Sequence, residues 1–250
     1  MSVFMDVWFA LIMNDDYKET LGALRECAKL WDVGRLHFLV LTNGADAKAV
    51  EKVSELAQEL GNLHVLNSHK NGRGSNFIKG AKYALKRARA SSVVVMLGGP
   101  KVSASYLGSA ISMLESDRLD GVFLNRLHGK SSSIKTGEKM FASFYRMFVE
   151  LLFGVKCSDV QSPAKFLKVG ALDKVFDNLT IRDYGFDINL IYEMHLQKMS
   201  FSELNVAIND DMTHKDFGYY FIVDTVIDTL WYRLYKTEFY KSLTARMKGF

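Results

Sequence analysis

The fold is decided by residues 36–66, LHFLVLTNGADAKAVEKVSELAQELGNLHVL. Residues 36–41 are apolar apart from one histidine, as expected for a strand that is buried on both faces of a sheet. Residues 47–60 carry apolar side chains at helical spacing and end before a glycine, which is typical of a helix terminus. Residues 63–66 are again mostly apolar and predict a second strand. A strand, a helix and a strand in this order form the βαβ unit of a parallel sheet.

The same alternation extends in both directions along the chain. It predicts further strands at residues 3–13, 92–97 and 121–124, and helices at residues 17–30, 76–89 and 103–114. The second half predicts helices at residues 138–153 and 185–198, a short helix ending at 176, strands at 164–169 and 201–208, and one long helix at 219–247. The sequence therefore predicts a doubly wound α/β domain followed by helices and a small β element. Such sheets bind ligands beyond the carboxyl ends of their strands.

Composition narrows the class of protein. The chain has 250 residues, of which 48% are hydrophobic and 24% charged, so it has enough apolar residues for one folded α/β domain. Two cysteines exclude a disulfide framework and a four-cysteine zinc site, and they fit a reducing compartment. The net charge of +4 permits anionic ligands without implying nucleic acid. We find no transmembrane run and no signal peptide, so we expect a cytoplasmic protein, with peripheral membrane association left open.

Four segments carry motifs whose order and spacing belong together. They are KNGRG at 70–74, the strand–helix–strand stretch that ends in Asn125-Arg126, LLFGVKCSDVQSPAKF at 151–166, and YGFDINL at 184–190. Together they resemble family-2 glycosyltransferases of the GT-A fold, in particular polyprenyl-phosphate sugar synthases of the dolichol-phosphate mannose synthase type. The resemblance implies an α/β GT-A domain with a mostly parallel sheet flanked by helices. It also implies a nucleotide-sugar donor and a polyprenyl-phosphate acceptor.

The resemblance further implies which residues form the site. Asp187 would face the acceptor as a base or orienting group, and a helix cap is the alternative. The residues implied or inferred to bind substrate are Asn14, Asp15, Asn43, Arg73, Arg126, Lys135, Asp159, Gln161 and Lys215. For Arg73, which lies between two glycines, a plain turn remains the alternative to a phosphate-binding loop. Solvent exposure is the alternative for Arg126, and backbone bonding in a turn is the alternative for Asp159.

The sequence departs from the family where the metal would bind. The family's D-x-D motif corresponds here to Gly98-Gly99-Pro100, and none of these side chains can ligate a hard cation. Lys101 follows directly, so a lysine takes the place of a metal ion in the predicted site, and we count it with Asp187 as a candidate catalytic residue. We therefore expect no metal site and no divalent metal cofactor.

Three functions remain open on the sequence alone. The first is a glycosyltransferase that works without metal, with cationic side chains stabilising the departing diphosphate. The second is a catalytically inactive protein that binds a nucleotide or a partner subunit. The third is a scaffold or membrane-docking module. Whether the chain is an enzyme is therefore left undecided at this stage.

The C-terminal segment suggests a further role. We divide the chain into a GT-A-like domain at residues 1–215 and a helical extension at residues 216–250. After Thr229 the extension has five basic residues and one acidic residue among many aromatic ones. This composition suits an interfacial helix on an anionic bilayer. Packing on the domain, or in a homo- or hetero-oligomer, is the alternative.

Overall fold

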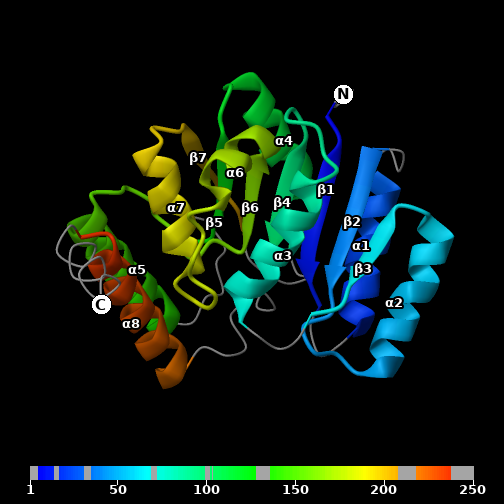
Figure 1. Cartoon of the computed structure of the whole chain (residues 1–250), viewed down its shortest axis with the longest axis horizontal. Helices are drawn as coiled ribbons and strands as arrows, with labels where there is room; N and C mark the ends of the chain where they lie inside the picture. The colour runs from blue at the N-terminus through cyan, green and yellow to red at the C-terminus, as the bar shows by residue number, and fades with distance from the viewer. Residues whose placement is uncertain are drawn as a thin grey trace, which may run out of the picture.

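The computed structural model describes residues 5–13, 17–30, 35–68, 72–98, 102, 104–127, 136–207 and 218–237. These residues form a seven-stranded sheet in the order β3-β2-β1-β4-β6-β5-β7 (Figure 1). The strands are β1 (Val7–Ile12), β2 (Leu36–Leu41), β3 (Leu63–Leu66), β4 (Val93–Leu97), β5 (Gly121–Asn125), β6 (Ala164–Lys168) and β7 (Phe201–Asn205). The predicted α/β fold, with a mostly parallel sheet flanked by helices, is confirmed.

Helices cover both faces of the sheet. They are α1 (Tyr17–Leu30), α2 (Ala47–Leu60), α3 (Arg73–Leu85), α4 (Ala104–Ser116), α5 (Thr136–Phe153), α6 (Val169–Phe176), α7 (Phe186–Leu196) and α8 (Tyr219–Tyr235). Alternate strand residues divide between two cores, because successive side chains of a strand point to opposite faces. Phe9 and its neighbours at every second position face α1, α2 and α4, whereas Trp8, Ala10 and Ile12 face α3 and the later helices.

One strand interrupts the parallel pattern. β6 lies between β4 and β5 and runs antiparallel to both, while β5 pairs in parallel with β7. The second half of the chain therefore completes the main sheet, whereas the sequence predicted only a small β element there and assigned it no neighbouring strands. This placement brings the residues around β6 to the same edge as the carboxyl ends of β1, β2 and β4.

Element boundaries differ from the prediction at two informative places. α3 begins at Arg73, three residues earlier than expected, so Arg73 lies in the first turn of a helix and not in a loop. α8 ends at Tyr235, and the backbone N–H of Lys236 bonds to the carbonyls of Tyr232 and Leu234. The prediction of one helix through residue 247 is therefore wrong at Lys236 and Thr237, and residues 238–247 lie outside the described residues.

α8 packs closely on the rest of the protein. Phe221 and Tyr232 of α8 are buried in the same core as α3, α5, α6 and α7. None of the helices in the described residues combines the length and the apolar character needed to span a bilayer. The division of the chain at residue 215 stays a prediction.

Candidate functional site

Several charged side chains gather where β4 and β5 end and where β6 begins. In Figure 1 the carboxyl ends of β1, β2 and β4 point to the lower edge of the sheet, and the first turn of α3 reaches the same edge. Arg73 comes from this turn, and Arg126 follows β5 directly. The cluster contains three cations and three carboxylates: Arg73, Arg126, Lys165, Glu138, Asp159 and Asp187. We call these six residues the ion network.

Arg126 forms the first half of the ion network. Its Nε lies 2.7 Å from Oδ2 of Asp159 and its Nη2 lies 2.9 Å from Oδ1, so the two side chains form a bidentate pair. Oδ2 of Asp159 also accepts the backbone N–H of Arg126. Its Nη1 lies 3.4 Å from Oε1 of Glu138, and Nη2 donates to the carbonyl of Gln161. Arg126 is only 3% exposed. Arg126 is therefore buried and bonded to Asp159, Glu138 and the Gln161 carbonyl, and the alternative of a solvent-exposed arginine is wrong.

The pKa shifts in this half follow from the pairing. Burial alone would raise the pKa of Asp159, but the Arg126 guanidinium outweighs burial and holds that pKa below its usual range. Burial alone would lower the pKa of Arg126, but Asp159 and Glu138 raise it. Both groups therefore stay ionised in the interior.

Asp187 forms the second half of the ion network. Its Oδ1 lies 2.7 Å from Nζ of Lys165, and its Oδ2 lies 3.6 Å from Nη1 of Arg73. The Ser162 carbonyl accepts from both cations, at 2.9 Å each. Burial lowers the pKa of Lys165, and the neighbouring Asp187 offsets part of this effect. Both carboxylate oxygens of Asp187 face cations, so the geometry favours a positioning role for Asp187.

Secondary structure explains why these side chains meet. Lys165 shares a sheet face with Leu167, which packs in the core beside α3 and α7, so its amine reaches Asp187 in the first turn of α7. Asp159 lies in the loop before β6. Glu203 of β7 fixes this loop by accepting the backbone N–H groups of Ser158 and Asp159. The sequence analysis missed Lys165 and Glu138. Lys165 could have been found because it is a charged residue inside an otherwise apolar predicted strand, and such residues are rarely buried without a partner.

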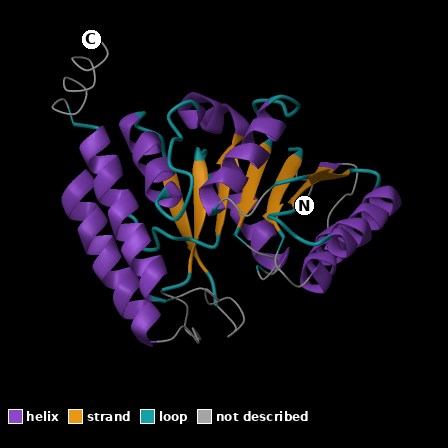
Figure 2. Ribbon diagram, turned by 60° about the horizontal axis from the view of Figure 1, so that its bottom comes forward, coloured by secondary structure: helices purple, strands orange, loops and turns teal. Residues whose placement is uncertain are grey.

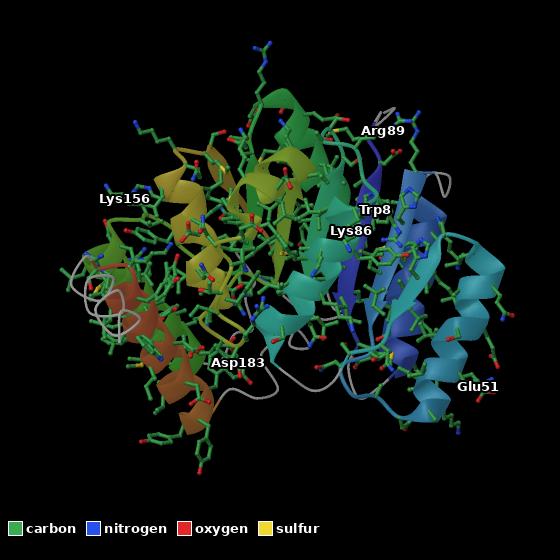
Figure 3. The ribbon with its side chains drawn as sticks, in the orientation of Figure 1. Trp8, Glu51, Lys86, Arg89, Lys156 and Asp183 are labelled. Atoms are coloured by element: carbon green, nitrogen blue, oxygen red, sulfur yellow. The ribbon has the colours of Figure 1, made fainter. Side chains whose placement is uncertain are left out.

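Close packing explains the glycines on either side of Arg73. A Cβ at Gly72 would lie 2.8 Å from the Arg182 carbonyl oxygen, and one at Gly74 would lie 2.7 Å from that of Ile181. The backbone N–H of Arg73 bonds to Asp183, which Figure 3 labels near this end of α3, and the N–H of Ser75 bonds to the Arg182 carbonyl at 2.7 Å. These two N–H groups are already satisfied. The glycines therefore allow the start of α3 to pack closely on residues 181–183.

Neutral polar residues gather at the ends of β2 and β3. Asn43 has a φ of +49°, its backbone N–H donates to Oγ of Ser68, and its Oδ1 accepts from Asn76 at 3.0 Å. Thr42 bonds to both Asn67 and Ser68. We call these five residues, Thr42, Asn43, Asn67, Ser68 and Asn76, the amide cluster. Asn76 also donates to the Gly72 carbonyl, so α3 links the amide cluster to Arg73 of the ion network.

The structure therefore brings together only part of the predicted site. Arg73, Arg126, Asp159 and Asp187 meet in the ion network, and Asn43 lies in the amide cluster at the other end of the first turn of α3. Gln161 contributes its backbone carbonyl, while its side chain faces Thr225 of α8 at 3.4 Å. The remaining predicted residues lie outside the described residues: Asn14, Asp15, Lys101, Lys135 and Lys215.

An arginine side chain lies against the end of β4. A Cβ at Gly98 would lie 3.1 Å from Nη2 and 3.2 Å from Cζ of Arg73, so the guanidinium is directly beside Gly98, the position that the sequence resemblance aligns with the family's first aspartate. A cation there would repel a divalent ion. Within the described part of the chain, no group of three or more histidine, cysteine, aspartate or glutamate side chains could hold a metal.

Comparison with known structures identifies the fold. The crystal structure of glucosyl-3-phosphoglycerate synthase from Mycobacterium tuberculosis, in complex with Mn²⁺, UDP-glucose and phosphoglyceric acid, matches with a TM-score of 0.65 and 11% identity over 92% of this chain and 80% of that one. S. aureus TarS 1-349 in complex with UDP-GlcNAc matches with a TM-score of 0.57 and 12% identity over 94% and 68%. The fold is that of the GT-A glycosyltransferases. No protein-family model and no curated protein matches the chain.

Proposed function

We propose that this protein transfers a sugar from a nucleoside diphospho-sugar to a polyprenyl phosphate without a divalent metal. The observation that supports the proposal is the Arg73 guanidinium, which lies against Gly98. By the sequence resemblance, Gly98 takes the position of a metal-binding acid. The structural neighbours bind UDP-sugars, and one also binds a phosphorylated acceptor, which supports the substrate classes. The lipid nature of the acceptor rests on the sequence resemblance.

The chemistry requires little base catalysis. An anionic oxygen of the lipid phosphate attacks the anomeric carbon, the bond from that carbon to the β-phosphate oxygen breaks, and the nucleoside diphosphate leaves with the electron pair. Configuration at the anomeric carbon inverts. Because the nucleophile is already charged, stabilisation of the leaving group dominates the barrier. This agrees with an Asp187 that is paired with two cations.

Arg73 is the described residue best placed for the leaving group. Its Nε is buried and has no hydrogen-bond partner among the described residues, while Nη2 holds the Ser162 carbonyl. Asp187 orients this guanidinium from the other side. We propose that Arg73 and Lys101 share the role that a metal plays in related sites. Arg126, with its donors engaged by Asp159, Glu138 and the Gln161 carbonyl, would position the loop before β6.

A second candidate is a catalytically inactive subunit that binds a nucleotide or a partner. The charge balance of the ion network favours it, since three carboxylates offset the three cations and leave little net charge for a diphosphate. Asp183, Asp224 and Asp228 also lie close enough to interact beside α3, and burial and mutual repulsion raise the pKa of Asp183. These acids weaken the attraction of the region for phosphate.

Nucleotide titration followed by a turnover assay separates the two candidates. We expect a nucleoside diphosphate, drawn from a panel of UDP, GDP, CDP and ADP, to bind equally well with magnesium and with EDTA. Arg73→Met should weaken binding by about tenfold or more, the equivalent of one charge-assisted contact. Arg89→Met, which removes an exposed arginine, is the matched control and should leave binding unchanged.

The outcomes are distinct. Transfer of labelled sugar to polyprenyl phosphate in EDTA supports the metal-independent transferase. Binding without transfer to any lipid phosphate supports the inactive subunit. If binding requires magnesium, the proposed role of Arg73 is wrong. If no nucleotide binds, the transferase and the nucleotide-binding form of the inactive subunit both fail, and only a subunit that binds a partner remains. Thermal unfolding of Arg73→Met shows whether a loss of binding reflects a loss of fold.

A further inference from the structure

Basic residues are concentrated on and around α3. Residues 73–89 contain six arginines and lysines and no aspartate or glutamate, and the stretch without acids extends from residue 60 to residue 114. The rest of the chain contains more acidic than basic residues, so the net charge of +4 gives no sign of this concentration. A local excess of positive charge on one helix attracts anionic partners.

Helical spacing places most of these charges on the outer side of α3, because residues three, four, seven and eight positions apart share one face of a helix. The exposed basic residues on this side, which we call the basic stripe, are Lys79, Lys82, Lys86 and Arg87. Phe77, Ala81 and Ala84 lie on the inner side and are completely buried. Figure 2 shows the sheet as a layer with helices on both sides, so α3 turns its apolar side to the sheet and its basic side outward.

The charges of the basic stripe are not neutralised by neighbouring acids. Among the described residues no carboxylate forms an ion pair with the stripe, although α6 packs beside α3 and exposes Asp173 and Asp177. The amine of Lys79 donates to the Asn67 carbonyl, and the guanidinium of Arg87 lies 3.7 Å over the ring of Tyr83. Both partners are neutral, so the positive charges remain.

Aromatic and histidine rings lie directly beside the basic stripe. Trp8 of β1 stacks on His37 of β2, with ring centroids 4.1 Å apart and ring planes 14° apart. His64 of β3 lies 5.3 Å from the ring of Tyr83 of α3, measured between centroids, and Trp8 lies 6.4 Å from the same tyrosine. We call these four residues the ring cluster. Because Arg87 lies over Tyr83, the ring cluster and the basic stripe form one continuous surface.

Part of the ring cluster faces solvent. His37, His64 and Tyr83 are each partly exposed, whereas Leu39, which shares its sheet face with His37, is completely buried. The sheet is therefore open at this corner, next to the end of α3. Rings at an open corner can stack on the flat faces of a ligand.

The composition of this surface favours a nucleic acid over a protein. Protein interfaces are anchored by apolar and aromatic side chains that enter pockets of the partner. The large hydrophobic residues that are well exposed in the described part of the chain include none on α3, β2 or β3. Cations interleaved with rings are instead the combination that binds single-stranded nucleic acids, since lysine and arginine contact phosphates while rings stack on bases.

The geometry favours a single strand over a duplex. α3 lies flat on the sheet with its inner side buried, so it cannot enter a major groove as a recognition helix does. From Lys79 to Arg87 the basic stripe is about 12 Å long at a rise of about 1.5 Å per residue, which is enough for about three or four nucleotides. The rings can stack only on bases that are not already stacked within a duplex.

We propose that the basic stripe and the ring cluster bind single-stranded nucleic acid without sequence preference. The basic stripe holds successive phosphates, and the ring cluster offers ring surface to the bases. The proposal does not rest on the proposed function, because none of these residues belongs to the ion network or to the amide cluster. The two are also measured with different ligands, so each can fail alone.

Fluorescence anisotropy with the full chain tests the proposal. We expect labelled oligo(U) and oligo(dT) of about twelve nucleotides to bind with micromolar dissociation constants in about 50 mM salt. The logarithm of the association constant should fall with the logarithm of the salt concentration at a slope of about −3, as four phosphate contacts on a single strand imply. Binding of either strand supports the proposal, and the tighter one identifies RNA or DNA as the preferred ligand.

Removing two charges from the basic stripe should weaken binding and its salt dependence together. Lys82→Gln combined with Lys86→Gln should reduce the affinity by about tenfold or more in low salt and reduce the slope to about −1.5, because two phosphate contacts are lost. The matched control is Lys48→Gln combined with Lys156→Gln, which removes the same charge from exposed lysines outside α3. The control should leave both quantities unchanged. Both double variants should bind nucleoside diphosphates like the unmodified chain.

Removing a ring should weaken binding without changing the salt dependence. Burial lowers the pKa of His64 below its ordinary value of 6.5, so His64→Leu removes a ring and no charge at neutral pH. We expect about fivefold weaker binding or more, the equivalent of one stacked base, and an unchanged slope. Thermal unfolding shows whether each variant is folded, and the exposed lysines of the double variant keep the test valid if His64→Leu is unstable.

Four results would overturn the proposal. The first is no binding of either strand, and the second is equal binding by the Lys82 and Lys86 double variant and its control. The third is an unchanged affinity of folded His64→Leu, which would mean that the surface takes any polyanion. The fourth is equally tight binding of a glutamate-rich helical peptide with the same charge as oligo(U), which would identify the surface as a site for an acidic protein.

Discussion

The ion network and the amide cluster lie at the same edge of the sheet and are joined by the first turn of α3. They differ in how their polar groups are paired in the interior. The amide cluster is neutral, and its groups pair through ordinary hydrogen bonds such as Asn76 to Asn43 at 3.0 Å. The ion network contains six charged side chains, of which Arg73 is partly exposed and the other five are buried, and each has an opposite charge within 3.6 Å. Removing one partner of a neutral buried hydrogen bond costs about 1–3 kcal/mol, whereas removing one partner of a buried ion pair leaves a lone charge and costs about 3–5 kcal/mol.

The protein should therefore tolerate substitutions in the amide cluster better than substitutions in the ion network. A substitution in the amide cluster removes one or two hydrogen bonds and leaves the rest intact. A substitution in the ion network changes the charge balance of the whole group. If the contrast is real, stability should depend much more on Arg126 than on Asn76, although both side chains are almost completely buried.

Removing the central cation should have the largest effect. Arg126→Met leaves Asp159 and Glu138 buried without their shared partner, and we expect a loss of about 3–5 kcal/mol in the free energy of unfolding. Chemical denaturation measures this loss. Adding Asp159→Asn to Arg126→Met removes one uncompensated charge and should recover part of it.

The control for this prediction is Arg89→Met, since Figure 3 labels Arg89 at the surface near the end of the molecule that carries the amino ends of the strands. It should change stability by no more than about 0.5 kcal/mol. A similar small change for Arg126→Met would mean that the ion network is not a balanced set of charges.

Breaking the amide cluster should have a smaller effect. Asn76→Ala removes the donor to Asn43 Oδ1 and to the Gly72 carbonyl, both at 3.0 Å, and we expect a loss of about 1–3 kcal/mol. Asn178→Ala, at an exposed asparagine side chain, is the matched control. A loss for Asn76→Ala as large as that for Arg126→Met would remove the distinction between the two clusters.

Of the two clusters, acid should act on the ion network and not on the neutral amide cluster. Arg126 holds the pKa of Asp159 below its ordinary value of 3.8, so the carboxylate stabilises the fold above that value and the contribution is lost as pH falls through the depressed pKa. Below pH 3.8 we expect the unfolding free energy to fall by up to about 1.4 kcal/mol per pH unit from this group. Denaturation of Asp159→Asn over the same pH range should show a shallower slope. Equal slopes would show that the pairing does not lower this pKa.

Much of the fold was predictable because its signals are local. Residues 36–41 are continuously apolar, and the structure contains β2 at those positions, as predicted. The place of β6 was not predictable, because the pattern of Ala164–Lys168 is the same whichever strands pair with it. The end of α8 at Tyr235 was also missed, since aromatic and apolar residues continue beyond it at helical spacing.

The sequence predicted several residues of the site but not the contacts between them. Arg126 and Asp159 were both selected as substrate-binding candidates, but their bidentate pairing joins residues 33 positions apart and depends on the strand order. The comparisons concern the fold alone, so the substrate-binding role of Arg126 and Asp159 stays a prediction. Arg73 was assigned to a loop, either a phosphate-binding loop or a plain turn, because the two flanking glycines give no local sign that the segment around Arg182 packs against them.

The antiparallel insertion of β6 also constrains how the chain is made. Until Ala164–Lys168 leaves the ribosome, β4 has only one neighbour, and its VVVML sequence presents a bare row of amide and carbonyl groups. An apolar strand in this state is a template for aggregation. Premature termination between α4 and β6 would therefore produce fragments that associate with one another, and rapid completion of the second half protects the nascent chain.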